Sequence, residues 1–202
     1  MVNRERLKTE PELRLFVALE LPAQVHDALA ELQREVKSLA HGLERLRWVR
    51  PEGIHITLKF LGGTPASRVA AIAEAVGKAT DGVPPHELRL GKLGKFGGRQ
   101  SPRVLWVDVE GDVAATLRLQ AQVEEEITPL GFPPEKRAFS PHITLARVPP
   151  EVSAKVAPVL AKAIDAVLVP VTHIPVRQVS LMRSELRREG AVYTRLEAAP
   201  LG

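Results

Sequence analysis

Apolar and polar residues alternate along this chain with two different periods, which predict strands and helices. Alternation over residues 13–21 predicts a buried strand, and apolar positions three and four apart predict a helix over 22–46. Residues 1–12 follow neither period and are expected to form a polar tail. The same criteria predict helices over 67–80, 112–130 and 151–167, and strands over 54–61, 87–93, 104–109, 142–148, 172–183 and 191–196.

Glycine residues mark the ends of several segments. Gly62-Gly63 is expected to end the second strand, Gly131 the third helix, and Glu189-Gly190 is expected to join the last two strands. The basic, glycine-rich stretch 94–102 is expected to be a loop. Several neighbouring strands are close enough in sequence to form hairpins, and no linker divides the chain. The pattern therefore favours one α+β domain over 13–202, with mixed or antiparallel sheets rather than a doubly wound parallel sheet.

Composition narrows the class of protein. The 202 residues are 45% apolar, which suits a globular core. No apolar run approaches the roughly 18 residues of a transmembrane helix. The N-terminus lacks the apolar stretch of a signal peptide, so a cytoplasmic protein is expected. The absence of cysteine excludes disulfides, thiolate nucleophiles and cysteine-bound zinc. A monomer is expected, because one core accounts for the apolar periodicity.

The net charge of +4 favours anionic partners such as RNA or phosphate esters. A well-solvated, arginine-rich surface explains the same charge equally well. Aromatic residues make up only 4% of the chain, which argues against a broad platform for stacking bases. The charge therefore supports a phosphate-containing partner without identifying one.

The tetrapeptide His-Ile-Thr-Leu occurs twice, at 55–58 and 142–145. Each copy starts a predicted strand, follows a turn that contains proline, and is soon followed by a basic residue, Lys59 or Arg147. A single His-x-Thr is explained best as a structural pair on a strand. Two copies that share all four residues and their surroundings favour a functional site instead.

The period of a strand explains the spacing within each copy. Side chains alternate between the two faces, so the histidine and threonine share one face while isoleucine and leucine occupy the other. The apolar pair is expected to be buried in the core. Two such strands that face each other would surround one cavity with His55, Thr57, His142 and Thr144.

Two histidines and two threonines suit the cleavage of a phosphodiester. One neutral imidazole can take a proton from water, and the other, protonated, can give one to the departing oxygen. Each threonine hydroxyl can donate to a non-bridging phosphate oxygen. A zinc site is the rival interpretation, but the other histidines lie in unrelated contexts and no HExxH motif occurs. We therefore expect a site without metal or cofactor.

These residues resemble the two-histidine (2H) phosphoesterase superfamily, and within it the RNA 2′,3′-cyclic phosphodiesterase family, historically called 2′-5′ RNA ligases. The resemblance extends over nearly the whole chain. Its most specific feature is a pair of motif blocks in the family's order. The segments that carry the resemblance are 14–18, 48–49 with 55–62, 102–106, 139–147, 184–186 and 190–193.

The resemblance implies a bilobal, pseudo-two-fold fold with a central cleft and one His-x-Thr motif in each lobe. It implies hydrolysis of RNA 2′,3′-cyclic phosphate ends to 2′-phosphomonoesters, and the reverse 2′-5′ joining of RNA ends such as tRNA halves. By the family's roles, His55 is the proton donor and His142 the proton acceptor. The sequence itself leaves the two roles interchangeable, since both histidines have the same neighbours. Met182 stands where the family leads us to expect an aromatic residue.

Three further residues are candidates for substrate binding. Arg147 resembles a family position near the phosphate, although its odd offset from His142 requires a bulge or a strand end to turn it inward. Lys59 is two residues after Thr57 and should share the histidine's face, where it contacts phosphate or lies at the rim. Phe16 either packs in the core or stacks on a base.

Other functions remain open from the sequence alone. One alternative is a 2H phosphoesterase whose substrate is a small cyclic nucleotide or a 2′-5′ oligonucleotide. A protein that binds RNA ends without catalysis is the alternative from another class. Both histidines and both threonines are present, which disfavours a site that has lost its chemistry.

Overall fold

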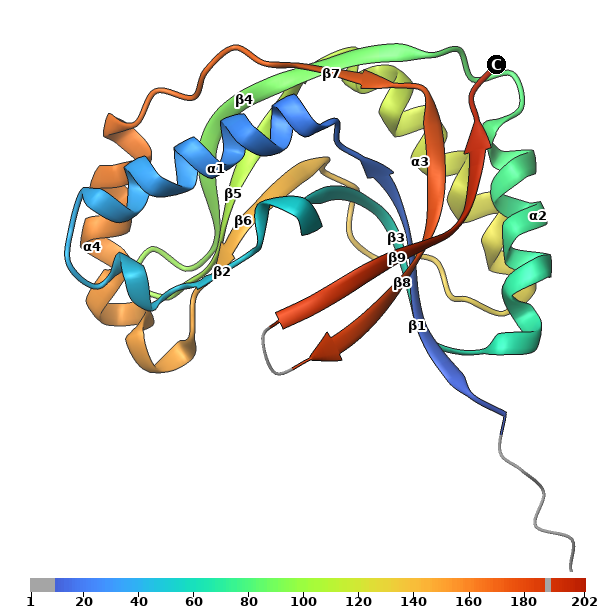
Figure 1. The fold of residues 1–202 in the computed structure, drawn as a ribbon, viewed down its shortest axis with the longest axis horizontal. Helices are drawn as coiled ribbons and strands as arrows, with labels where there is room; N and C mark the ends of the chain where they lie inside the picture. The colour runs from blue at the N-terminus through green and yellow to red at the C-terminus, as the bar shows by residue number, and fades with distance from the viewer. Residues whose placement is uncertain (1–9, 188–189) are drawn as a thin grey trace, which may run out of the picture.

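The computed structural model describes residues 10–187 and 190–202, and within them the chain forms two β-sheets covered by four α-helices (Figure 1). The helices are α1 Ala23–Ser38, α2 Val69–Thr80, α3 Val113–Ile127 and α4 Pro150–Ala166. The strands are β1 Glu12–Glu20, β2 Arg47–Trp48, β3 His55–Pro65, β4 His86–Gly97, β5 Pro102–Gly111, β6 His142–Arg147, β7 His173–Val176, β8 Gln178–Arg187 and β9 Gly190–Pro200.

The first sheet has the strand order β3-β1-β8-β9 and the second has the order β2-β6-β5-β4-β7. Every strand pair recorded among the described residues is antiparallel. The α+β class predicted from the sequence is thus confirmed, with antiparallel rather than mixed sheets.

Each sheet is covered by one helix from the first half of the chain and one from the second. Helices α2 and α3 contact strands of the first sheet, and α4 contacts β4 and β5 of the second (Figure 1). Helix α1 directly follows β1 of the first sheet but packs on the second, where Gln33 donates hydrogen bonds to the carbonyls of Val49 and Leu145. One continuous cluster of buried apolar side chains therefore includes residues from both sheets.

The first helix ends earlier than the periodicity predicts. Instead of continuing to residue 46, α1 ends at Ser38, and Gly42 adopts a left-handed conformation with φ of 101°. The apolar period continues because Leu43 and Leu46 are buried in the same core through a short 3-10 turn. By contrast, the predicted start of the third helix is confirmed, since Asp112 caps α3 through a 3.0 Å bond from the Ala115 N–H. Helix α3 ends at Ile127, and a 3-10 turn, Thr128–Leu130, continues to Gly131, which is left-handed as expected of a helix stop.

Several strand boundaries differ from prediction. Gly62-Gly63 does not end the second strand, because β3 continues through both glycines, paired with β1, as far as Pro65. The expected loop over 94–102 is strand as far as Gly97, because Gly94 pairs with Trp106 across β4 and β5. The expected strand 172–183 is two strands, β7 beside β4 and β8 beside β1, so this segment passes from one sheet to the other at Arg177. Strand β1 begins at Glu12, inside the expected tail; residues 1–9 and Glu189 lie outside the described residues.

Candidate active site

The two His-Ile-Thr-Leu copies open β3 and β6, which belong to different sheets. The two strands approach each other, with Cα atoms within 8 Å. In both copies the isoleucine and leucine are buried and the histidine and threonine are half-buried, as strand alternation predicts. One copy of the motif is thus present in each sheet, on strands that are neighbours in space.

Each histidine is held by the same hydrogen bond. Nδ1 lies 2.8 Å from the carbonyl oxygen two residues upstream, that of Gly53 for His55 and that of Ser140 for His142. A carbonyl can only accept, so Nδ1 carries the proton in both rings and Nε2 is the nitrogen with a free lone pair when the ring is neutral. The repeated turn therefore sets the same tautomer and ring orientation twice.

Aromatic rings surround both histidines. The His55 ring is stacked on Phe16, with centroids 4.6 Å apart, and meets Tyr193 edge-on at 5.1 Å. The His142 ring meets Phe96 edge-on at 4.8 Å. Packed rings of this kind restrict the rotamer of a histidine. Each imidazole is therefore fixed by its backbone hydrogen bond and by at least one neighbouring ring.

A carboxylate lies directly across the strand pair from each histidine. Glu20 pairs with His55 across β1 and β3, and Asp108 pairs with His142 across β5 and β6. Directly opposite residues present their side chains on the same face of a sheet. Glu20 itself accepts hydrogen bonds from the Ser180 hydroxyl and from Arg195. Each imidazole therefore has an acidic neighbour on its own side of the sheet.

The electrostatic environment of His55 favours its neutral form. Burial against the neighbouring rings lowers the pKa of His55 below its usual value, because the charged imidazolium loses solvation. The bond to the Gly53 carbonyl and the charge of Glu20 act in the opposite direction, with a smaller effect. In the free protein, then, His55 is poised as a neutral imidazole near neutral pH.

A β-bulge follows the motif in both strands. The register of β3 on β1 and of β6 on β5 shifts just after the threonine. Two consecutive residues are buried there, Leu58 with Lys59 in β3 and Leu145 with Ala146 in β6. The next residue, exposed in both copies, returns to the face of the histidine and threonine. The bulge that Arg147 required to face inward is therefore present.

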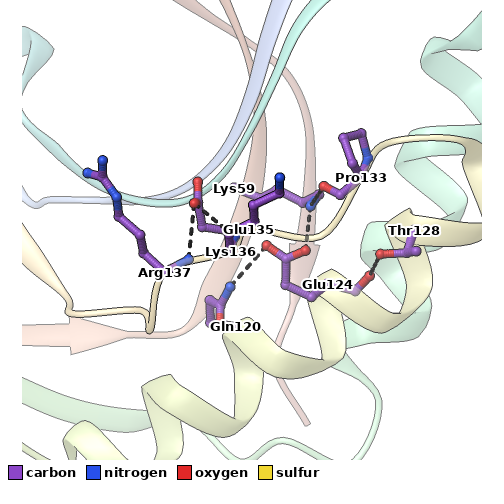
Figure 2. A network of polar contacts seen from close by, with 8 residues as sticks. All are labelled: Lys59, Gln120, Glu124, Thr128, Pro133, Glu135, Lys136 and Arg137. Atoms are coloured by element: carbon purple, nitrogen blue, oxygen red, sulfur yellow. Dashed lines mark hydrogen bonds and ion pairs between the residues drawn. The ribbon is translucent and has the colours of Figure 1, made fainter.

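Lys59 lies on the opposite side from the one that simple alternation predicts. The bulge turns it into the core, where it is 5% exposed. Figure 2 shows its Nζ reaching Glu124 of α3, with which it forms an ion pair, and it also donates to the Pro133 carbonyl at 3.0 Å. The expectation that Lys59 shares the histidine's face is wrong, because it holds β3 against α3 instead.

Phe16 is only 2% exposed and is covered by His55, Tyr193 and Met182. It supports the histidine ring rather than presenting a free face. The neighbouring side chain on the same face is Phe60, which is 66% exposed with its ring centroid 6.3 Å from that of Phe16. Met182, which replaces the expected aromatic residue, pairs with Phe16 across β1 and β8.

Sequence reasoning missed several residues around the histidines. Phe60 had a readable signal, because it stands at the same offset after the first histidine as Arg147 does after the second. The others come from distant strands and become neighbours only through strand pairing. They are Glu20, Phe96, Asp108 and Tyr193.

Two further features concern the whole of the described chain. Among residues 10–187 and 190–202, no three histidine, aspartate or glutamate side chains gather closely enough to bind a metal ion. No helix in the same residues combines the length and hydropathy needed to cross a membrane.

Comparison with known proteins places the chain in a family. The model described as LigT like Phosphoesterase matches it twice, over residues 19–106 and 107–193, and each segment contains one His-Ile-Thr-Leu copy. The RNA 2′,3′-cyclic phosphodiesterase of Aeropyrum pernix is 34% identical over 169 residues, which is 83% of this chain and 93% of that one. A protein of the same name from Geobacillus stearothermophilus is 36% identical over 132 residues, 65% of this chain and 41% of the relative's own length.

Solved structures give the same answer. The crystal structure of TT0787 from Thermus thermophilus superposes with a TM-score of 0.73 and 31% identity, covering 94% of this chain and 98% of that one. Escherichia coli LigT in complex with 3′-AMP superposes with a TM-score of 0.72 and 25% identity, covering 95% of this chain and 99% of that one. Sequence and fold thus agree that the chain belongs to the LigT-like phosphoesterase family.

Proposed function

We propose that this protein hydrolyses RNA 2′,3′-cyclic phosphate ends to 2′-phosphomonoesters. The observation that carries the proposal is the repeated site: two histidines in adjoining strands, each with Nδ1 bound to a carbonyl 2.8 Å away and Nε2 left for chemistry. The names of the curated relatives support the same reaction. Two imidazoles held by the same hydrogen bond can serve one as the general acid and the other as the general base.

In the proposed reaction, His142 Nε2 takes a proton from water as the water oxygen attacks phosphorus. The bond from phosphorus to O3′ breaks, and protonated His55 gives its Nε2 proton to the departing O3′. The hydroxyls of Thr57 and Thr144 donate to the two non-bridging oxygens, where negative charge grows. With the 5′-hydroxyl of a second RNA in place of water, the same proton transfers join the two RNA ends through a 2′-5′ bond.

The donor role of His55 depends on the substrate. Burial lowers the pKa of His55, which disfavours the protonated form that a donor needs. A bound cyclic phosphate carries a negative charge beside the ring and favours that protonated form. We therefore propose that His55 takes up its proton together with the substrate, with Glu20 across the strand adding to the attraction.

Two exposed residues after the bulges are proposed as substrate contacts. Arg147 is on the histidine's face of β6 and would bind a phosphate of the RNA strand. Phe60 takes the base-stacking role that was one of two considered for Phe16, because its exposed ring can stack on a base whereas that of Phe16 is covered. Stacking on an aromatic side chain is worth about 1–3 kcal/mol per base.

We further propose that the enzyme acts as a monomer in the cytoplasm, on RNA fragments such as tRNA halves. One continuous core that joins both sheets supports the monomer. The complex of Escherichia coli LigT with 3′-AMP supports a ribonucleotide end as the bound group.

The test is the turnover of an oligoribonucleotide that ends in a 2′,3′-cyclic phosphate, with EDTA present and with the position of the product phosphate mapped. We expect turnover that EDTA leaves unchanged and a product with a 2′-phosphate. Complete loss in EDTA would exclude the metal-free mechanism, and a 3′-phosphate would exclude O3′ as the leaving oxygen. Parallel reactions with a nucleoside 2′,3′-cyclic phosphate and a 2′-5′ oligonucleotide test the other substrates, and binding without turnover would indicate a non-catalytic RNA-end binder.

A further inference from the structure

Three arginines surround a pocket at the far end of β6. The pocket has a volume of about 420 Å³ and opens to solvent where β5 begins, β6 ends and α4 starts. Arg47, Arg103 and Arg147 line it, with Pro149 and Ser153 contributing to its wall. Of these residues, only Arg147 was a candidate for substrate binding from the sequence. None of the others belongs to the site proposed above.

Strand pairing places two of the three cations side by side, and Arg103 joins them where the strands end, with its carbonyl accepting a 2.8 Å hydrogen bond from the Val148 N–H and its side chain lining the same pocket. Arg47 lies directly opposite Arg147 across β2 and β6, so their side chains share one face of the sheet. Like charges directly opposite each other destabilise a sheet. Among the described residues, no carboxylate forms an ion pair with any of the three. An anion that occupies the pocket would remove this repulsion.

The position of the pocket identifies which anion it suits. Arg147 and His142 lie at opposite ends of β6, five residues apart, which is about 16 Å at a strand rise of about 3.3 Å per residue. That separation is too large for Arg47 and Arg103 to bind a phosphate held between the two histidines. It fits instead the neighbouring phosphates of an RNA strand that lies along β6.

We propose that the arginine pocket, formed by Arg47, Arg103 and Arg147, binds the backbone phosphates of the RNA strand on the 5′ side of its cyclic phosphate end. The proposal rests on the proposed function and adds to it a preference for oligonucleotides over mononucleotides. Guanidinium groups suit this role because they bind phosphate oxygens in pairs. The contact is independent of RNA sequence, since it reads only the backbone.

A comparison of two substrates distinguishes an effect of a substitution on the pocket from an effect on the catalytic centre. The kcat/KM is measured for a short oligoribonucleotide 2′,3′-cyclic phosphate and for a nucleoside 2′,3′-cyclic phosphate, in wild type, Arg47→Ala and Arg103→Ala. Each variant should lower the ratio of the two values about tenfold, the typical effect of losing one hydrogen bond to a charged group. The control is Arg118→Ala, which removes the same charge from an exposed position on α3 and should leave the ratio unchanged.

Salt dependence provides a second readout that a merely structural role would not move. Each lost phosphate contact should reduce the slope of log kcat/KM against log salt by about 0.7 for a single strand. An unchanged ratio and slope in both variants, or an equal loss on both substrates, would overturn the proposal.

Binding separates failure of the pocket from failure of the proposed function. The dissociation constant of a fluorescent oligoribonucleotide that ends in a 3′-phosphate is measured by anisotropy, so no turnover is needed. Should the wild type hydrolyse neither cyclic phosphate, the proposed function fails while this titration still tests the pocket. Weaker binding by about tenfold in Arg47→Ala and Arg103→Ala supports the pocket, and unchanged binding overturns it. Thermal denaturation checks that each variant is folded.

Discussion

At the scale of single residues, the two histidines have the same hydrogen bond but different surroundings. The 2.8 Å bonds from Nδ1 give both rings one tautomer. His55 is enclosed by Phe16 and Tyr193, and its pKa is lowered by that burial. Environment can thus assign different tasks to residues that are identical in the sequence. This difference leads to a prediction about pH.

The folded protein should lose stability as the pH falls through about 6.5, the ordinary pKa of histidine. Burial lowers the pKa of His55 in the folded state, so the unfolded chain binds a proton first as the pH falls. The contribution is therefore complete above that pH and is lost between it and the lowered folded value. Thermal midpoints measured from pH 8 to pH 5 should fall less steeply in His55→Asn than in the wild type. Parallel curves for the two proteins would contradict the lowered pKa.

A second residue-scale prediction concerns the close contact of Gly94 with Trp106. A Cβ at Gly94 would collide with the six-membered part of the Trp106 indole, which lies across it. Gly94→Ala should destabilise the fold by about 1–3 kcal/mol, the usual cost of overpacking. The matched control is Gly77→Ala within α2, where nothing lies within 4 Å of the new Cβ. That change should stabilise by about 0.5–1 kcal/mol, and urea unfolding that gives both variants the same sign would contradict the packing.

At the scale of elements, strand alternation correctly predicts which side chains of the motif are buried, from its histidine to its leucine. It fails at the residue that follows the leucine. The sequence predicts that His55, Thr57 and Lys59 share a face, and the first two do. A bulge is a property of the pairing with β1, so no pattern within β3 alone reveals it. The same limit applies to the segment 172–183, where the change of sheet at Arg177 depends on two different partner strands.

The candidate site could be predicted to the same extent. The repeated tetrapeptide made His55, Thr57, His142 and Thr144 the candidates, because chemistry and period both appear in the local sequence. The residues that surround them could not be predicted in this way, because residues such as Tyr193 belong to strands that are distant in the sequence. Elements with strong local patterns were predicted well, and α1 was overextended only because the core continues beyond Gly42.

The ion pair between Lys59 and Glu124 makes a prediction about stability. Lys59→Met leaves the largely buried Glu124 carboxylate without its cation, at a cost of about 3 kcal/mol. The double variant Lys59→Met/Glu124→Leu should recover most of that loss, because two apolar side chains can replace a buried pair. Chemical denaturation of the three proteins measures both effects. Should Lys59→Met keep its stability and lose activity, the original expectation of a substrate contact would be restored.

At the scale of the whole molecule, the chain is built from two related segments that share one core. The family model matches residues 19–106 and 107–193 separately, yet the buried cluster includes side chains from both. Helix α1 follows a strand of the first sheet and packs on the second, so neither sheet is covered by its own segment alone (Figure 1). Strands β3 and β6 approach each other within this shared core, as the proposed two-histidine site requires.

The shared core predicts that the protein unfolds as one unit. Trp48 and Trp106 both lie in the second sheet, so tryptophan fluorescence reports on that sheet, whereas circular dichroism reports on all helices and strands. The two signals should follow one transition in urea. A fluorescence midpoint well separated from that of the dichroism signal would mean that the sheets unfold independently.

The most direct test of the account compares kcat/KM on an oligoribonucleotide 2′,3′-cyclic phosphate for wild type, His55→Ala, His142→Ala and the double variant. His173→Ala is the matched control, a strand histidine held by Glu87 on β4. If the two histidines act as one acid–base pair, each single change costs at least about 10²–10⁴ in rate, and the double variant loses little more than the worse single one. Near-wild-type turnover in either single variant, or losses that multiply fully in the double variant, would contradict the two-histidine mechanism.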